Sequence, residues 1–276
     1  MDAFMETVDV AGYQFHYTLS GQLDGVKPAI LFLHGFMGDC HTFDRIIPWL
    51  KDDFSCLSVD LPGHGQTKTP ILDRSDTLQK VASALIDLLT CLGLARCALV
   101  GYSMGGRLAL YLTLHFPERF VKTILESASP GLKTQVEREE RIERDFKLAR
   151  DLETGSFSAF LWRWYDNPLF ASLRQHPEFP KIMKMRLSND PIALAKTLRN
   201  LSTGRQPSLW EMLVDNQIPL FLLSGEFDTK FIAINTEMKQ HCQTAKLKIV
   251  PGCGHNIHFE DPPTFARLLR EFLEVG

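Results

Sequence analysis

The pentapeptide GYSMG at residues 101–105 constrains the fold of this chain more than any other feature. The apolar run at residues 97–100 predicts a strand before it, and residues 107–116 predict a helix after it. Between a strand and a helix, G-x-S-x-G forms a sharp turn that exposes the serine at the end of a sheet. A Cβ atom on either glycine would collide with the neighbouring strand or helix. We therefore expect Ser103 to be a nucleophile or base, and the alternative is a glycine-rich turn with an incidental serine.

Strands and helices alternate along most of the chain, which predicts an α/β fold with a mostly parallel sheet covered on both faces. The other predicted strands are residues 8–17, 29–33, 54–59, 121–126, 219–223 and 247–250, and the other predicted core helices are residues 78–92, 232–241 and 264–273. A helix-rich segment interrupts this alternation after the predicted strand at residues 121–126. We expect residues 131–206 to form a cap over the carboxyl edge of the sheet, with residues 1–130 and 207–276 as the core.

The composition is that of an ordinary globular protein. Its 276 residues are 45% hydrophobic and 23% charged, and the formal net charge of −3 gives no reason to expect nucleic acid or a membrane as a partner. No apolar run is long enough to cross a bilayer, and the N-terminus carries no signal pattern, so a cytoplasmic protein is expected. We also expect a monomer or a weak homo-oligomer. The six cysteines lack C-x-x-C spacing, so we expect reduced thiols and no metal site.

Two residues could activate the serine, because each directly follows a predicted strand. Asp228 and His255 come after the last two predicted strands, so both are expected at the same edge of the sheet as Ser103. The histidine would take the serine proton, and the carboxylate would fix the histidine tautomer. Glu226 and Glu126 are the rival acids. The chain order Ser, Asp, His is that of the α/β-hydrolase fold.

An oxyanion hole requires two backbone N–H donors. The first is expected from Met104, the residue after the serine, and the second from Phe36 in the turn that follows the strand at residues 29–33. His34 is expected to brace this turn. His64, which lies between two glycines, is expected to be structural rather than catalytic.

Arg107 lies one helical turn after Ser103, on the same side of the predicted helix. A poorly solvated arginine is costly unless it meets an anion, and a substrate carboxylate bound by both nitrogens is a natural partner. The alternative is an ion pair with a cap acid such as Glu139 or Asp145. On the predicted cap helix, Glu137 with Arg141 and Glu140 with Arg144 could equally form ordinary exposed i,i+4 pairs.

The sequence resembles the α/β-hydrolases over essentially its whole length. More narrowly, it resembles the 2-succinyl-6-hydroxy-2,4-cyclohexadiene-1-carboxylate (SHCHC) synthase family of the menaquinone and phylloquinone pathways. The segments that carry the resemblance are FLHGFMGDCHTF, VDLPGHG, LVGYSMGGRLAL, ESASPGL, the arginine-rich helix, WYDNPLFASL, LSGEFDTKF and GHNIHFEDP. GYSMGGR, SPGL with the following arginines, and the patterns WYxxPLF and GExDxKF are the more specific ones.

This resemblance implies a lyase that acts on a small-molecule polycarboxylate without a metal or organic cofactor. The substrate would be 2-succinyl-5-enolpyruvyl-6-hydroxy-3-cyclohexene-1-carboxylate (SEPHCHC), from which pyruvate is eliminated. The resemblance also implies that Arg141 and Arg186 join Arg107 in binding carboxylates, that Trp164 forms a wall of the pocket, and that Tyr102 lines it.

Two other functions remain open at this point. A serine hydrolase, either a carboxylesterase or a C–C bond hydrolase, would use the same triad through an acyl-enzyme. A ligand-binding protein of weak catalytic activity could also use this fold.

Overall fold

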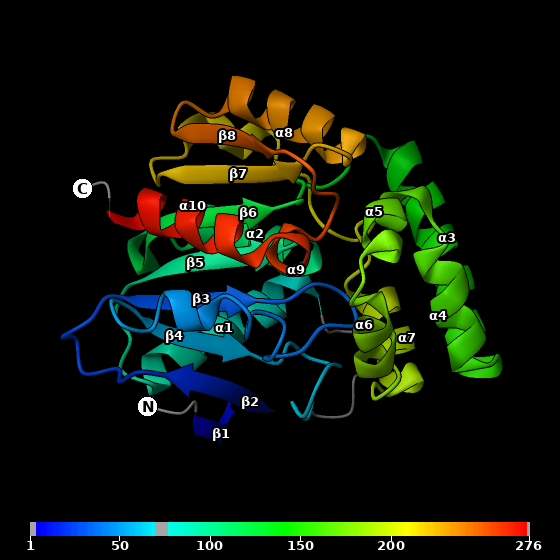
Figure 1. Cartoon of the computed structure of the whole chain (residues 1–276), viewed down its shortest axis with the longest axis horizontal. Helices are drawn as coiled ribbons and strands as arrows, with labels where there is room; N and C mark the ends of the chain where they lie inside the picture. The colour runs from blue at the N-terminus through cyan, green and yellow to red at the C-terminus, as the bar shows by residue number, and fades with distance from the viewer. Residues whose placement is uncertain (1–3, 70–76, 275–276) are drawn as a thin grey trace.

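The computed structural model describes residues 4–69 and 77–274, and Figure 1 shows its arrangement. Within these residues the strands form one eight-stranded sheet in the order β1-β2-β4-β3-β5-β6-β7-β8. β2 pairs antiparallel with β1 and β4, and all other neighbouring strands pair in parallel. The strands are β1 (Phe4–Val10), β2 (Tyr13–Ser20), β3 (Ala29–Leu33), β4 (Ser55–Val59), β5 (Cys97–Tyr102), β6 (Phe120–Glu126), β7 (Leu220–Gly225) and β8 (Ala245–Val250).

Helices cover both faces of this sheet. The core helices are α1 (Leu78–Cys91), α2 (Met104–His115), α8 (Thr229–His241), α9 (Ile257–Glu260) and α10 (Pro262–Glu274). Leu31 and Leu33 of β3 share one apolar cluster with α1, α2 and α8, whereas Ile30 and Phe32 share the opposite cluster with α10. Because both faces are covered, all five residues of β3 are buried, as expected of a strand inside a parallel sheet.

Five helices lie between β6 and β7 and form the cap. They are α3 (Gln135–Thr154), α4 (Phe157–Tyr165), α5 (Ala171–Gln175), α6 (Phe179–Arg186) and α7 (Pro191–Asn200). Figure 1 shows them grouped beyond one end of the sheet, and they share an apolar cluster of their own that includes Phe160 and Leu194. The predicted helical insertion after the sixth strand is confirmed.

One predicted strand was wrong. Residues 8–17 do not form a single strand, because the chain reverses at Ala11 and Gly12 to make the β1–β2 hairpin. Both turn residues have positive φ, 50° and 82°. A two-residue hairpin turn of this kind usually carries asparagine, aspartate or glycine at its first position, so alanine hid the turn in the sequence.

The other predicted elements are present with small differences at their ends. In the described part of the chain, no helix has the length and apolar character needed to cross a membrane.

Candidate active site

Ser103 occupies a strained turn between β5 and α2. Its φ of 50° and ψ of −106° lie outside the common regions for a non-glycine residue. A Cβ atom on Gly101 would lie 2.6 Å from the carbonyl oxygen of Gly105, and one on Gly105 would lie 2.2 Å from that of Leu33. The predicted collisions are confirmed. However, the unusual backbone angles belong to the serine, and the glycines are needed for close approach.

Ser103, His255 and Asp228 form a continuous chain of hydrogen bonds. The distance from His255 Nε2 to Ser103 Oγ is 3.2 Å, and that from His255 Nδ1 to Asp228 Oδ2 is 2.7 Å. Both the histidine and the aspartate are buried. Because a carboxylate can only accept a hydrogen bond, Nδ1 of His255 carries the ring proton and donates it to Asp228. The lone pair of Nε2 then faces the serine hydroxyl, which is the arrangement that a general base requires.

The rival carboxylates bind other groups. Glu126 accepts a hydrogen bond from Nδ1 of His258 at 2.8 Å and is fully buried. Glu226 accepts from the backbone N–H of Gly252 at 2.9 Å. Asp228 is therefore the acid that contacts His255 in this structure.

The turn after β3 lies against the sharp turn at residues 101–105, which we call the elbow. A Cβ atom on Gly35 would be 2.6 Å from the ring of Tyr102 and 3.5 Å from Cβ of Ser103. As expected, His34 braces this turn: its Nδ1 donates to the Gly35 carbonyl at 2.8 Å, and its Nε2 accepts from the Leu61 N–H at 2.9 Å. These two bonds define a neutral imidazole, and burial lowers its pKa accordingly.

Phe36 and Met104 line the same cavity as Ser103. Across residues 4–69 and 77–274, neither of their backbone N–H groups has a hydrogen-bond acceptor. Two unpartnered donors beside a serine can stabilise an oxyanion, which is the role expected for these residues.

A cavity of about 430 Å³ opens between the core and the cap and includes Ser103 and His255. Its charged lining consists of five cations, Arg107, Arg141, Arg144, Arg163 and Lys230, and two carboxylates, Asp145 and Asp151. The excess of three positive charges suits a polyanionic ligand. Trp164 also lines the cavity and packs on Phe36, with ring centroids 5.3 Å apart.

Arg107 has only neutral partners. Its Nη1 donates to Oε1 of Gln206 at 2.8 Å, and its Nη2 donates to the Leu201 carbonyl at 2.9 Å. Of the carboxylates in the described ranges, none lies within 4.0 Å of it, so the alternative ion pair with Glu139 or Asp145 does not form. Burial, and then the charge of Arg141, lower the pKa of Arg107 to about 10, so the guanidinium remains charged at neutral pH and its charge is poorly compensated.

Arg141 is held by Asp145 of the same helix. Its Nε donates to Oδ1 of Asp145 at 2.8 Å, and the carboxylate is fully buried. Among the described residues Arg141 thus pairs with Asp145 and not with Glu137, and the pair faces the cavity rather than open solvent. The second oxygen of Asp145 has no hydrogen-bond partner among the described residues.

Comparison with known proteins decides between families that share this fold. Residues 28–262 match the α/β-hydrolase fold family. The SHCHC synthase of Enterobacter sp. (strain 638) is 33% identical over 260 residues, which span 93% of this chain and 97% of that protein. This chain belongs to the SHCHC synthase family.

Two further relatives agree with this family. The solved structure of MenH from S. aureus superimposes with a TM-score of 0.89 at 33% identity, covering 94% of this chain and 97% of that one. The chloroplastic protein PHYLLO of Arabidopsis thaliana is 35% identical over 283 aligned positions, which cover 96% of this chain and 16% of that protein.

Two residues that the resemblance to SHCHC synthases placed in the pocket do not line this cavity. Arg186 is buried, with its Nε donating to the Tyr165 hydroxyl at 3.2 Å and its Nη1 to the Met37 carbonyl at 2.7 Å. Tyr102 is buried beneath Gly35 and packs on the rings of neighbouring histidines. In this structure both side chains have partners within the protein, and their expected roles in substrate binding stay predictions.

Sequence reasoning missed the carboxylate that holds the His255 loop. Glu260 accepts hydrogen bonds from the backbone N–H groups of Gly254 at 2.9 Å and Asn256 at 3.3 Å, on either side of the histidine. An acid five residues after a histidine is an ordinary pattern, so nothing in the sequence distinguished it.

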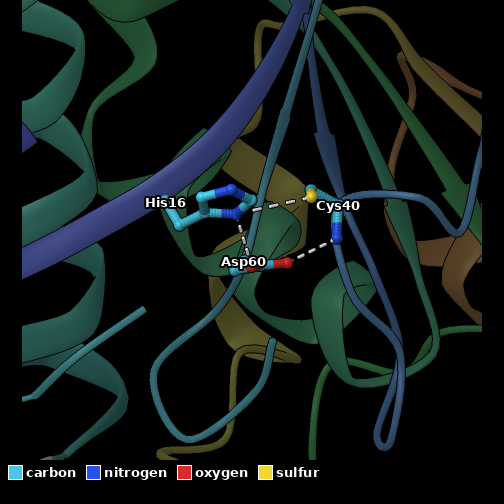
Figure 2. Close-up of side chains that lie close together, drawn as sticks. All are labelled: His16, Cys40 and Asp60. Atoms are coloured by element: carbon cyan, nitrogen blue, oxygen red, sulfur yellow. Dashed lines mark hydrogen bonds and ion pairs between the residues drawn. The ribbon is translucent and has the colours of Figure 1, made fainter. Parts of the chain in front are cut away.

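In the part of the chain that the structure describes, one group has side chains of metal-ligand type: His16, Cys40 and Asp60 (Figure 2). Asp60 already accepts from Nδ1 of His16 at 2.7 Å and from the backbone N–H groups of Cys40 and Gln66 at 2.6 and 2.7 Å. Burial, and then the charge of Asp60, raise the pKa of the Cys40 thiol, which disfavours the thiolate that a metal requires. The group is a hydrogen-bonded brace that joins β2 to the loops after β3 and β4.

Proposed function

We propose that this protein is an SHCHC synthase, which eliminates pyruvate from SEPHCHC to give SHCHC. The observation that carries the proposal is the triad of Ser103, His255 and Asp228 inside a cavity with an excess of three positive charges. SEPHCHC carries three carboxylates, so its charge complements this lining. The names of the relatives support the same reaction.

In this mechanism Ser103 acts as a base. His255 takes the serine proton while Asp228 stabilises the imidazolium. The serine oxygen removes the proton from C2 of the ring, α to the succinyl carbonyl, and the N–H groups of Phe36 and Met104 hold the resulting enolate oxygen. The ring double bond then moves from C3–C4, so that C2–C3 and C4–C5 become double bonds as enolpyruvate leaves C5. Enolpyruvate takes up a proton to become pyruvate, and no water is consumed.

The proposed carboxylate ligands are Arg107 on the core and Arg141 and Arg186 on the cap, and Tyr102 is proposed to line the pocket. Arg107 lies one turn after Ser103, so a carboxylate bound to it would bring the ring close to the base. Trp164, packed on Phe36, would provide an apolar wall for the ring.

We further propose a cytoplasmic enzyme, monomeric or weakly self-associating, that uses no metal or organic cofactor and has residues 131–206 as a distinct cap. The six free cysteines, five of them buried, suit a reducing compartment.

Incubation of the purified protein with SEPHCHC, with lactate dehydrogenase reporting pyruvate, tests the proposal. We expect pyruvate and SHCHC in equal amounts and an unchanged intact mass of the enzyme. Absence of pyruvate together with rapid turnover of a p-nitrophenyl ester would instead support the serine hydrolase alternative.

A further inference from the structure

Gln206 contacts Arg107 from the segment that leads from the last cap helix, α7, back to the core. It is 1% exposed and does not itself line the cavity. Its side chain forms one hydrogen bond with the residues that the structure describes, which Oε1 accepts from Nη1 of Arg107 at 2.8 Å. Gln206 therefore acts on a ligand in the cavity through this arginine.

The orientation of the Gln206 amide is fixed by the arginine. A guanidinium only donates, so the amide oxygen must face it and the amino group must point elsewhere. Nε2 is buried and has no acceptor among the described residues, and a Cβ atom on Gly131, at φ 94°, would lie 3.2 Å from it. A buried amide that served only the fold would be expected to have both of its polar groups paired. The contact with Arg107 is thus the role that the structure gives to this side chain.

Both acceptors of Arg107 come from this one segment, and neither carries a full charge. The other acceptor is the carbonyl of Leu201, at 2.9 Å from Nη2, which is the C-cap of α7 and has the partial negative charge of a helix C-terminus. Two of the five guanidinium N–H groups are used in this way, and the other three have no acceptor in the described ranges. Two neutral groups thus orient the arginine, while its charge stays available in the cavity.

Arg141 shows the contrasting arrangement in the same cavity. Its Nε donates to Asp145, a fully buried carboxylate that offsets its charge. A carboxylate at position 206 would offset the charge of Arg107 in the same way. Glutamine has nearly the shape of glutamate without the charge, so it accepts the hydrogen bond and leaves the guanidinium to pair with a ligand.

We propose that Gln206 is a positioning residue that favours an anionic substrate, because its neutral amide orients Arg107 and leaves the positive charge for a substrate carboxylate. The inference rests on the proposed function, since it takes the ligand of Arg107 to be one of the three carboxylates of SEPHCHC. The backbone N–H of Arg107 donates to the Ser103 carbonyl at 3.0 Å. The direction of the arginine side chain therefore also sets where the bound ring lies relative to the base.

Two substitutions separate this role from a purely structural one. Gln206→Glu keeps the shape and the acceptor but adds a charge that would pair with Arg107, whereas Gln206→Met removes the acceptor and adds no charge. Gln217→Glu is the matched control, because Gln217 is exposed and does not line the cavity. The readouts are KM and kcat for SEPHCHC and, by calorimetry, the Kd for propane-1,2,3-tricarboxylate.

We expect Gln206→Glu to raise KM and Kd by more than about tenfold, because the ligand must compete with the new ion pair, while kcat stays within about twofold. Gln206→Met should raise them about threefold, since the guanidinium keeps its charge but loses part of its orientation. Gln217→Glu should match the wild type. A structural brace would give the opposite order, because methionine loses the hydrogen bond that glutamate keeps.

The proposal is overturned if Gln206→Met loses as much affinity as Gln206→Glu, or if Gln217→Glu loses as much. Should Gln206→Glu fail to fold, Gln206→Met decides alone, and a wild-type KM in that variant would contradict the role. Failure of the proposed function is distinguishable, because the wild type then releases no pyruvate while the Kd comparison still tests Gln206. A wild type that neither releases pyruvate nor binds the tricarboxylate would overturn both.

Discussion

Asp228 has two roles at once, and both arise from its place at the end of β7. Its Oδ2 accepts from Nδ1 of His255 at 2.7 Å, and its Oδ1 accepts from the Phe231 N–H at 3.3 Å to cap α8. The helix cap fixes the carboxylate, and the carboxylate fixes the histidine. The two rival acids lack this combination, because each binds a different group.

Asp228→Asn should therefore lower kcat without unfolding the protein. Asparagine can still cap the helix, but it cannot stabilise the imidazolium, so we expect a loss of about 10²–10⁴-fold in kcat. Steady-state pyruvate release measures it. Glu226→Gln is the control and should remain close to wild type; equal losses in both variants would remove Asp228 from the triad.

Two buried histidines make stability depend on pH. Burial, the largest cause for each, lowers the pKa of His34 and of His64 below the ordinary value of 6.5. As the pH falls below about 6.5, the unfolded chain takes up protons that the folded chain resists, so stability is lost toward acid. In the pH range between its pKa in the folded chain and its pKa in the unfolded chain, each such histidine changes the free energy of unfolding by up to about 1.4 kcal/mol per pH unit.

His64→Gln should make the free energy of unfolding depend less steeply on pH. Urea unfolding on either side of about pH 6.5 gives the change in free energy of unfolding for the variant and the wild type. The exposed His241 provides the control, since His241→Gln should keep the wild-type slope. An unchanged slope in His64→Gln would show that this imidazole does not resist protonation.

At the scale of elements, the site depends on how closely α2 approaches the end of β3. Gly105 lies in the first turn of α2, where a Cβ would meet the Leu33 carbonyl oxygen at 2.2 Å. A backbone atom cannot move aside as a flexible side chain does. The helix start, the elbow and the Phe36 turn are therefore positioned by one contact.

Gly105→Ala should lower stability and activity together. Overpacking of this kind costs about 1–3 kcal/mol or more, and it would displace Ser103 from His255. Gly93→Ala, at φ 71° with nothing within 4 Å of its Cβ, should cost about 1–2 kcal/mol and leave kcat unchanged. Thermal unfolding and pyruvate release separate the two, and an active Gly105→Ala variant would contradict the account.

The difference between strand patterns and the orientation of single side chains explains what could be predicted from the sequence. Buried strands are short apolar runs, and the serine, the aspartate and the histidine each follow one, so topology alone gathers them at one edge. Nothing local in the sequence shows whether a cap side chain such as Arg186 turns toward the cavity or toward a carbonyl such as that of Met37.

At the scale of the whole molecule, charge is distributed unevenly. The chain has a formal net charge of −3, yet the cavity lining has an excess of three positive charges. A cleft lined by charges of one sign attracts and orients a ligand of the opposite charge, and salt screens this attraction.

Raising the salt from about 0.02 M to about 0.5 M should therefore lower kcat/KM for SEPHCHC by about tenfold, mostly through KM. A neutral p-nitrophenyl ester is the control substrate, and any slow turnover of it should change little. Equal salt effects on both substrates would mean that the cationic lining does not select the substrate.

The most direct test of the account is the single-turnover rate of pyruvate release from SEPHCHC that carries deuterium at C2. If Ser103 removes this proton, the deuterated substrate reacts more slowly than the ordinary one, and no covalent adduct forms on the serine. Equal rates for the two substrates, together with an adduct on Ser103, would contradict the proposed elimination.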